Sequence, residues 1–222
     1  MVWARNIAAR RGHPPEGRFD MIDVDRTGDI WTVTLNRPEK ANSLTEQMLV
    51  DLRDTMRAAQ AARAVILSGS GKVFSAGADL EAARAGLATS PLWEEVSQAV
   101  ASLPGLSVAA LNGTLAGGAF GMALACDLRI AVPGANFFYP VMKLGFLPQP
   151  SDPGRLAALI GPSRAKLILM GGQKIAADEA LAFGLIDRIV APDDLMAVAQ
   201  TLVADTVAAD SAIATGIKDM CR

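Results

Sequence analysis

Residues 109–131 read "AALNGTLAGGAFGMALACDLRIA", with adjacent glycines at Gly117 and Gly118 and a further one at Gly121. Glycine inside a helix costs about 1 kcal/mol relative to alanine, so its presence here needs a reason. Gly117 and Gly118 open a predicted helix over 117–125, where the first backbone N–H groups have no partner within the helix. Small residues at this place predict close packing, a tight turn, or a backbone site that a ligand approaches closely.

Apolar strands precede and follow this helix. The segments 107–111 and 128–132 are short and apolar, and 64–68 has the same character, which is typical of strands covered on both faces. Residues 30–35 alternate as a further strand. This alternation of strand and helix predicts an α/β protein whose parallel sheet is built from ββα units with right-handed crossovers. Helices are expected at 43–60, capped by Ser43 or Thr45, and at 91–102.

The C-terminal third of the chain has a more helical pattern. Three segments, 153–161, 163–171 and 176–184, each end in glycine, as a helix with a left-handed C-cap does. A strand is expected at 185–191, followed by a helix at 192–209.

A second glycine-bearing stretch, "GSGKVFSAGADLEAA" at 69–83, resembles the first in its layout. Both stretches place small residues and free backbone N–H groups just beyond a strand and at the start of a helix. Two such donors that converge on one point can hold a developing oxyanion. Each glycine motif alone also fits a purely structural role.

The composition excludes several classes of function. The net charge of −2 gives no electrostatic reason to expect a nucleic-acid partner. The only histidine, His13, makes a His-centred triad or a multi-His zinc site hard to build. The distant cysteines, Cys126 and Cys221, predict free thiols in a reducing, cytoplasmic compartment and no metal site. No apolar run is long enough for a membrane span, and residues 1–20 predict a loosely ordered extension rather than a signal peptide.

Five stretches together resemble the enoyl-CoA hydratase/isomerase family, the crotonase superfamily. They occur in the family's order, and they are "VTLNRPEKANSL" at 33–44, "AVILSGSGKVFSAGADL" at 64–80, "LNGTLAGGAFGMALACDLRIA" at 111–131, "KLGFLPQPSDPGRLAALIG" at 143–161 and "GGQKIAADEALAFGLIDRIVAP" at 171–192. The resemblance implies a crotonase-like ββα superhelix over 21–191. It also implies a C-terminal helical region at 192–222 that is truncated relative to the family.

The resemblance implies that the chain binds an acyl-CoA thioester, with coenzyme A as part of the substrate and no separate cofactor or metal. The thioester enolate is held in this family by two backbone N–H groups, which correspond here to Ala78 and Gly118. On this reading Gly118 supplies a donor and Gly117 lets the thioester approach. Other residues that the resemblance places at the substrate are Ala76, Gly77, Asp79, Leu80, Gly121 and Val141, with Arg37, Lys40 and Ala41 near the adenine and pyrophosphate of CoA. Asp79 also fits a structural role in the oxyanion loop, and Lys40 also fits a solvated surface lysine.

The sequence departs from the family at the two catalytic glutamates of its hydratases. Their positions correspond here to Gly121 and Val141, and neither side chain transfers protons. Ordinary hydration is therefore not expected. Tyr139 and Asp152 are candidate replacements, although Tyr139 also fits a packing role and Asp152 a helix cap.

Three hypotheses follow from these features. The first is an enzyme with a non-standard reaction such as decarboxylation, which generates the enolate without a base. The second is an inactive acyl-CoA or acyl-carrier binding protein, and the third is a structural partner of an active hydratase. By resemblance we expect a homotrimer or a dimer of trimers. The apolar residues that other subunits are expected to bury are Leu195, Val198, Leu202, Ile213 and Ile217.

Overall fold

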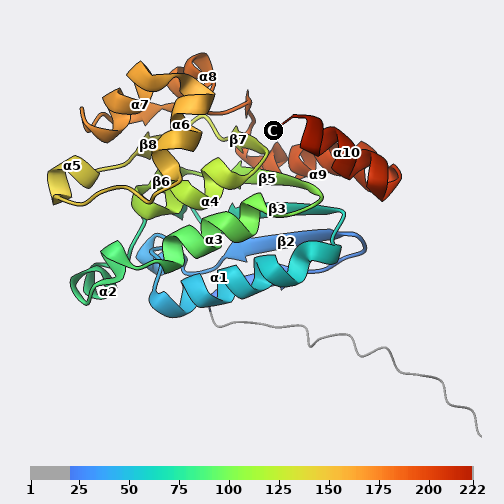
Figure 1. Cartoon of the computed structure of the whole chain (residues 1–222), viewed down its shortest axis with the longest axis horizontal. Helices are drawn as coiled ribbons and strands as arrows, with labels where there is room; N and C mark the ends of the chain where they lie inside the picture. The colour runs from blue at the N-terminus through green and yellow to red at the C-terminus, as the bar shows by residue number, and fades with distance from the viewer. Residues whose placement is uncertain (1–20, 222) are drawn as a thin grey trace, which may run out of the picture.

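A computed structural model describes residues 21–221 of the chain (Figure 1). The predicted N-terminal extension and His13 lie outside this range. The described residues form two β-sheets with helices packed around them. None of the helices within this range is long and apolar enough to span a membrane.

The larger sheet has six strands in the order β1-β2-β3-β5-β7-β10. Only β1 runs antiparallel to its neighbour, and every other pair is parallel. The central strands β3 and β5 are almost entirely buried, as their continuous apolar character predicts. The strands are β1 (Ile22–Asp25), β2 (Ile30–Leu35), β3 (Ala64–Gly69), β5 (Leu106–Leu111), β7 (Leu128–Ala131) and β10 (Arg188–Ile189).

The smaller sheet has four short strands in the order β4-β6-β8-β9, of which the first three are parallel. They are β4 (Val73–Ser75), β6 (Thr114–Ala116), β8 (Asn136–Phe138) and β9 (Ile175–Ala176). The chain alternates between the sheets. Each of β3, β5 and β7 is followed by a strand of the small sheet and then by a helix, so the predicted ββα unit occurs three times.

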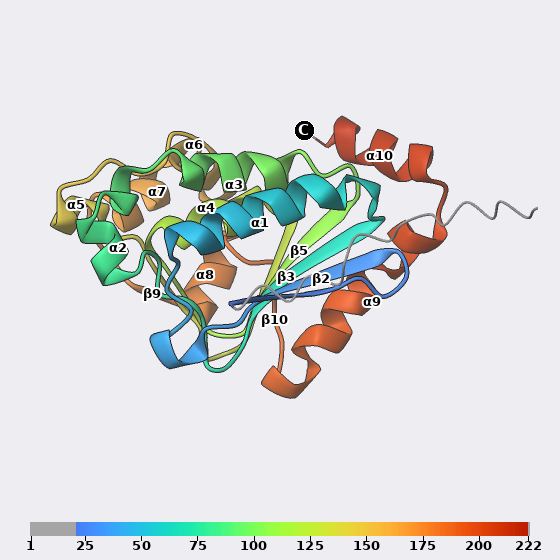
Figure 2. The ribbon, with the colours of Figure 1, turned by 90° about the horizontal axis from the view of Figure 1, so that it is seen from below.

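Helices cover the large sheet on both faces. Figure 2 shows α1 and α3 on one side of its strands and α9 on the other. The helices are α1 (Glu46–Ala58), α2 (Leu80–Arg84), α3 (Leu92–Ala101), α4 (Phe120–Ala125), α5 (Val141–Leu144), α6 (Asp152–Ile160), α7 (Pro162–Leu169), α8 (Ala177–Phe183), α9 (Leu195–Ala208) and α10 (Ser211–Met220). In both views α2 and α5 lie at one end of the molecule and α10 at the other.

Helix ends mostly follow the sequence signals. Of the two candidate caps for α1, Thr45 is the one used, since its hydroxyl accepts a hydrogen bond from the N–H of Met48 at 3.2 Å. Gly161 and Gly184 have positive φ angles of 80° and 83° just after α6 and α8. The third predicted glycine cap differs, because α7 ends at Leu169 and the positive φ falls on Gly172.

Two expectations need correction. The strand predicted at 185–191 contains only two paired residues, Arg188 and Ile189, at the edge of the large sheet. Leu195 was expected at a subunit interface, but it is only 3% exposed and belongs to the core of its own chain. Ile213 and Ile217, by contrast, are each 60% exposed on α10.

Helix α10 is fastened to the large sheet by a polar contact. The Nζ of Lys218 lies 2.8 Å from Asp127 Oδ2 and 2.8 Å from the carbonyl oxygen of Gly105. Asp127 also accepts hydrogen bonds from the N–H and the hydroxyl of Ser107, at 2.8 Å each. Asp127 therefore ties the segment after α4 and the last helix to the beginning of β5.

Candidate active site

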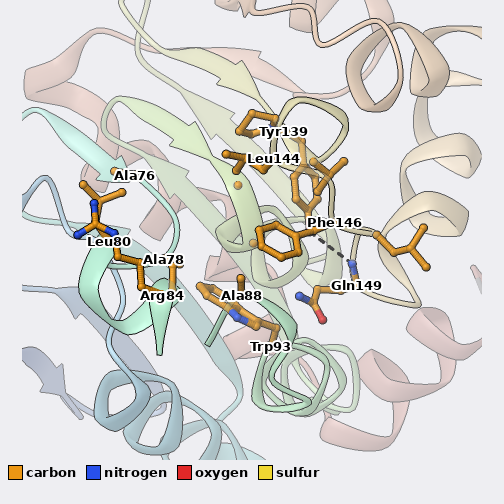
Figure 3. A pocket seen from close by; sticks show the side chains of 16 residues that line it. Ala76, Ala78, Leu80, Arg84, Ala88, Trp93, Tyr139, Leu144, Phe146 and Gln149 are labelled. Atoms are coloured by element: carbon orange, nitrogen blue, oxygen red, sulfur yellow. Dashed lines mark hydrogen bonds between the residues drawn. The ribbon is translucent and has the colours of Figure 1, made fainter. Parts of the chain in front are cut away.

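Three loops meet where the parallel strands of the small sheet end. The segments after β4, β6 and β8 begin at Ala76, Gly117 and Tyr139, and because these strands are neighbours, the segments lie side by side. They border a pocket of about 420 Å³ (Figure 3). Its lining is Ala76, Ala78, Leu80, Ala83, Arg84, Ala88, Trp93, Gly117, Gly118, Tyr139, Pro140, Val141, Leu144, Phe146, Leu147 and Gln149.

The loop after β4 is held by the segment before α1. The N–H of Leu44 donates to the carbonyl of Gly77 at 2.7 Å, and the N–H of Asp79 donates to the carbonyl of Leu44 at 2.9 Å. Because successive N–H groups of an extended segment point to opposite sides, the N–H of Ala78 points away from Leu44. Among residues 21–221 we find no acceptor for it.

Gly77 and Gly117 allow the first two loops to approach each other. Gly77 has a φ of +88°, and a Cβ there would lie 2.9 Å from the carbonyl oxygen of Ala116. Gly117 has a φ of +57° and its Cβ would lie 3.5 Å from the Cα of Gly77. The positive φ of Gly117 is thus a second reason for a glycine at this position, besides the predicted approach of a ligand.

Gly118 is small because an indole ring covers its open side. A Cβ at this position would lie 2.9–3.1 Å from three ring atoms of Trp93. Trp93 is itself fixed, since its Nε1–H donates to the carbonyl oxygen of Leu87 at 2.7 Å. Gly118 is the second residue of a 3-10 turn, Gly117–Ala119, so its N–H precedes the turn's own hydrogen bonds and is available to a ligand.

Asp79 has the structural role that the sequence left open. Its Oδ1 accepts from the N–H groups of Glu81 and Ala82 at the start of α2, at 3.0 and 3.3 Å. Its Oδ2 accepts from Arg37 Nη1 at 2.8 Å. The bond from Arg37, followed by those from the α2 backbone, holds the pKa of Asp79 below its usual value.

Tyr139 and Asp152 form a buried pair. The Tyr139 hydroxyl donates to Asp152 Oδ2 at 2.9 Å and accepts from the N–H of Gln149 at 3.4 Å. The Tyr139 ring also stacks on Phe120 with centroids 5.4 Å apart, so the packing role and the polar role coexist. Asp152 Oδ1 is buried and has no hydrogen-bond partner within the described range.

The surroundings of Asp152 favour its neutral form. Burial raises its pKa to about 7, and the hydrogen bond from Tyr139 opposes that shift in part. Burial also raises the pKa of Tyr139, with the charge of Asp152 adding to the effect, so Tyr139 stays protonated. Asp152 does not cap α6, because its only hydrogen-bonded side-chain oxygen is the one that binds Tyr139.

The pocket brings together about half of the residues predicted from the sequence. Those that line it are Ala76, Ala78, Leu80, Gly117, Gly118, Tyr139 and Val141. Gly77, Asp79 and Asp152 lie outside the lining: Gly77 and Asp79 belong to the loop after β4, and Asp152 is hydrogen-bonded to Tyr139. Gly121 also lies outside the lining, facing Asp152.

The three residues expected near CoA lie in the segment beside the first loop. Ala41 contacts this loop directly, since its carbonyl accepts from the N–H of Ala76 at 3.0 Å. Arg37 is bound to Asp79, and its Nη1 also donates to the hydroxyl of Ser43 at 3.1 Å. Lys40 is exposed.

Part of the pocket lining was not predicted from the sequence. Trp93 comes from α3, and Leu144, Phe146 and Leu147 come from α5 and the loop after it. No local pattern marks these apolar side chains as pocket residues, because their position depends on how α3, α5 and the loop after α5 are arranged in the folded chain. Among residues 21–221, the only charged residue in the lining is Arg84, and no carboxylate or imidazole is part of it.

Comparison with known proteins identifies the family. The sequence profile described as enoyl-CoA hydratase/isomerase matches residues 25–222, so the chain belongs to this family, a part of the crotonase superfamily. The expected crotonase-like fold with C-terminal helices is thereby confirmed.

Individual relatives support the assignment. YngF of Bacillus subtilis, assigned as an enoyl-CoA hydratase/isomerase, is 40% identical over 182 residues, which are 78% of this chain and 70% of YngF. The crotonyl-CoA hydratase of Syntrophomonas wolfei is 32% identical over 187 residues, or 80% of this chain and 72% of that protein. A Thermobifida fusca protein assigned as an enoyl-CoA hydratase, solved with CoA, has a TM-score of 0.81 at 28% identity and covers 90% of this chain and 84% of its own.

Proposed function

We propose that the chain binds an acyl-CoA thioester in this pocket and stabilises the thioester enolate with the N–H groups of Ala78 and Gly118. The observation that carries the proposal is that these two N–H groups, each free of an acceptor in its own loop, belong to loops that meet at one pocket. A pair of fixed donors aimed at a developing negative charge is the usual source of stabilisation in such sites. The CoA complex of the Thermobifida fusca relative supports the choice of ligand.

The lining suits the acyl part of such a ligand. Leu144, Phe146 and Leu147 are apolar and exposed at the wall of the pocket, with Leu147 89% exposed. Exposed apolar side chains around a concavity are typical of a binding site. The CoA moiety would run past Ala41 and Lys40, beside the loop that carries Ala78.

The reaction that fits this lining is one that needs no base. In decarboxylation of a malonyl-type thioester, the bond from the α-carbon to the carboxylate breaks. Its electron pair moves to the thioester oxygen as CO₂ leaves. The enolate that results is stabilised by the two N–H groups. Tyr139 is the hydroxyl in the lining that can then return a proton to the α-carbon.

A second candidate is an acyl-CoA or acyl-carrier binding protein without turnover. It is favoured by the absence of any carboxylate among the described residues that line the pocket. For either function we place the protein in the cytoplasm, because Cys126 and Cys221 are both free thiols.

Calorimetry and a turnover assay distinguish these functions. We expect saturable, micromolar-range binding of acetyl-CoA, and release of CO₂ from malonyl- or methylmalonyl-CoA. Binding without turnover of any thioester would select the second candidate. No heat with acyl-CoA of any chain length would contradict both.

A further inference from the structure

We propose that Asp152, on α6, holds the proton that reaches the substrate through Tyr139. Its carboxyl group occupies the space that a side chain at position 121 would fill, which is open because Gly121 has none. This proposal rests on the proposed function, since the proton goes to an enolate in the pocket. Asp152 does not line the pocket, so we assign it a positioning role behind Tyr139.

The first observation concerns space. A Cβ built on Gly121 would lie 2.9 Å from Asp152 Oδ1 and 3.5 Å from Oδ2. A side chain at position 121 and the present position of the Asp152 carboxyl therefore exclude each other. Gly121 stands where the family's hydratases have a catalytic glutamate. Its lack of a side chain leaves room for the carboxyl group of Asp152, which comes from a different helix.

The second observation concerns hydrogen bonds. Tyr139 Oη lies between the N–H of Gln149 and Asp152 Oδ2, while Asp152 Oδ1 has no partner within residues 21–221. A buried carboxylate with an unpartnered oxygen is costly, which favours its protonated form. When Asp152 is protonated, its O–H can donate to the Tyr139 oxygen. The Tyr139 hydrogen is then free for a ligand.

The third observation concerns charge. The groups that face Asp152 are Tyr139 on the pocket side, Glu94 on α3 and Arg155 on α6. Arg155 is engaged by the hydroxyl of Ser97, and Glu94 accepts from the N–H of Ser151 at 3.1 Å. Burial outweighs the effect of Arg155, and Glu94 adds to the shift, so the pKa of Asp152 lies at about 7. A proton held with this affinity is available near neutral pH.

The resulting step balances. After CO₂ leaves, the α-carbon of the enolate forms a bond to the Tyr139 hydroxyl proton, and the enolate electron pair forms that bond. The Tyr139 oxygen takes the proton of Asp152 in the same movement, which leaves Asp152 as a carboxylate. Water supplies one proton per turnover to restore Asp152 once the product has left.

The single tyrosine of this chain makes the pair directly observable. With ¹³C-labelled tyrosine, NMR of the whole protein reports Tyr139 alone. We expect its ring signals to titrate with a midpoint near pH 7 in the wild type and to lose this transition in Asp152→Asn. The control Glu94→Gln should keep the transition, with a lower midpoint. A wild-type signal that does not change between pH 5 and 9, or a transition that persists in Asp152→Asn, would overturn the proposal.

A functional arm separates this proposal from the proposed function. Acetyl-CoA binding should survive in Asp152→Asn, whereas the steady-state rate at which the protonated, decarboxylated acyl-CoA product forms should fall about 10²-fold or more and lose its decline above pH 7. If acetyl-CoA does not bind the wild type, the proposed function fails while the NMR titration can still stand. If Asp152→Asn turns over at the wild-type rate, only the relay fails.

Discussion

At the scale of single residues, the missing side chains of this site each make room for a neighbour. Gly118 accommodates the indole of Trp93, and Gly121 accommodates the carboxyl of Asp152. The consequence at Asp152 is a buried carboxyl group whose pKa is raised by its surroundings. Its titration must therefore affect the stability of the fold as well as chemistry.

The free energy of unfolding should depend on pH through Asp152. Its pKa is about 7 in the folded chain and near 3.9 when unfolded, so between these values the folded state binds one proton more. The stabilising contribution is complete below about pH 4 and is lost as pH rises through about 7, a change on the order of 4 kcal/mol. Urea unfolding of the wild type and Asp152→Asn should show Asp152→Asn gaining relative stability from pH 5 to pH 8.5. Parallel pH curves for the two proteins would contradict the assignment.

At the scale of elements, the site arises from three loops at the ends of neighbouring strands, and the first and third loops are held by different side-chain contacts. Asp79 fixes the first one, because it joins the start of α2 to Arg37. The third loop is fixed by Tyr139 through Phe120 and Asp152. These contacts hold the two loops in position, and fixed donors are what the proposed electrostatic stabilisation requires.

Asp79→Ala should damage both the fold and the site. It removes a helix cap, worth about 0.5–2 kcal/mol, and the bond from Arg37. We expect a fall of about 1–3 kcal/mol in the free energy of unfolding. We also expect weaker acetyl-CoA binding, because Ala78 directly precedes this residue. Glu81→Ala is the matched control, since its exposed side chain makes none of these contacts and should change both measurements little. Equal effects of the two variants would refute the role of Asp79.

Elements were predictable from the sequence where they bury a continuous apolar stretch. Residues 64–68 and 107–111 alternate with helices so regularly that the central parallel strands of the large sheet follow from pattern alone, whereas β1 was not predicted and β10 is shorter than expected. The small sheet does not follow from pattern, because β4, β6 and β8 have three residues each and are defined by pairing across the chain. The oxyanion loops could be proposed from the family motif. The contact between Gly121 and Asp152 could not, since it joins positions on two helices that no local signal connects.

At the scale of the whole molecule, the pocket and the last helix lie at opposite ends. Helix α10 is docked through Lys218 and Asp127, but Ile213 and Ile217 remain exposed. An exposed apolar stripe of this kind is typical of a surface that another subunit covers. The homotrimer or dimer of trimers expected from the family therefore stays a prediction, supported by α10 and not by Leu195.

Light scattering at micromolar concentration tests this assembly. The chain has a mass of 23.2 kDa, and we expect the measured mass to be three or six times larger. The double variant Ile213→Ser and Ile217→Ser should shift the mass toward that of one chain, whereas Leu181→Ser on α8 should not. A wild-type mass of one chain would remove the prediction.

The central claim is that the N–H groups of Ala78 and Gly118 hold the thioester oxygen, and NMR of these two amides tests it most directly. Addition of acetyl-CoA should move both amide protons downfield as a shared acceptor arrives, while CoA without an acyl group should leave both nearly unchanged. The amide of Ala76, which already donates to Ala41, is an internal reference. Saturable binding of acetyl-CoA that leaves the Ala78 and Gly118 amides where they were would contradict the account.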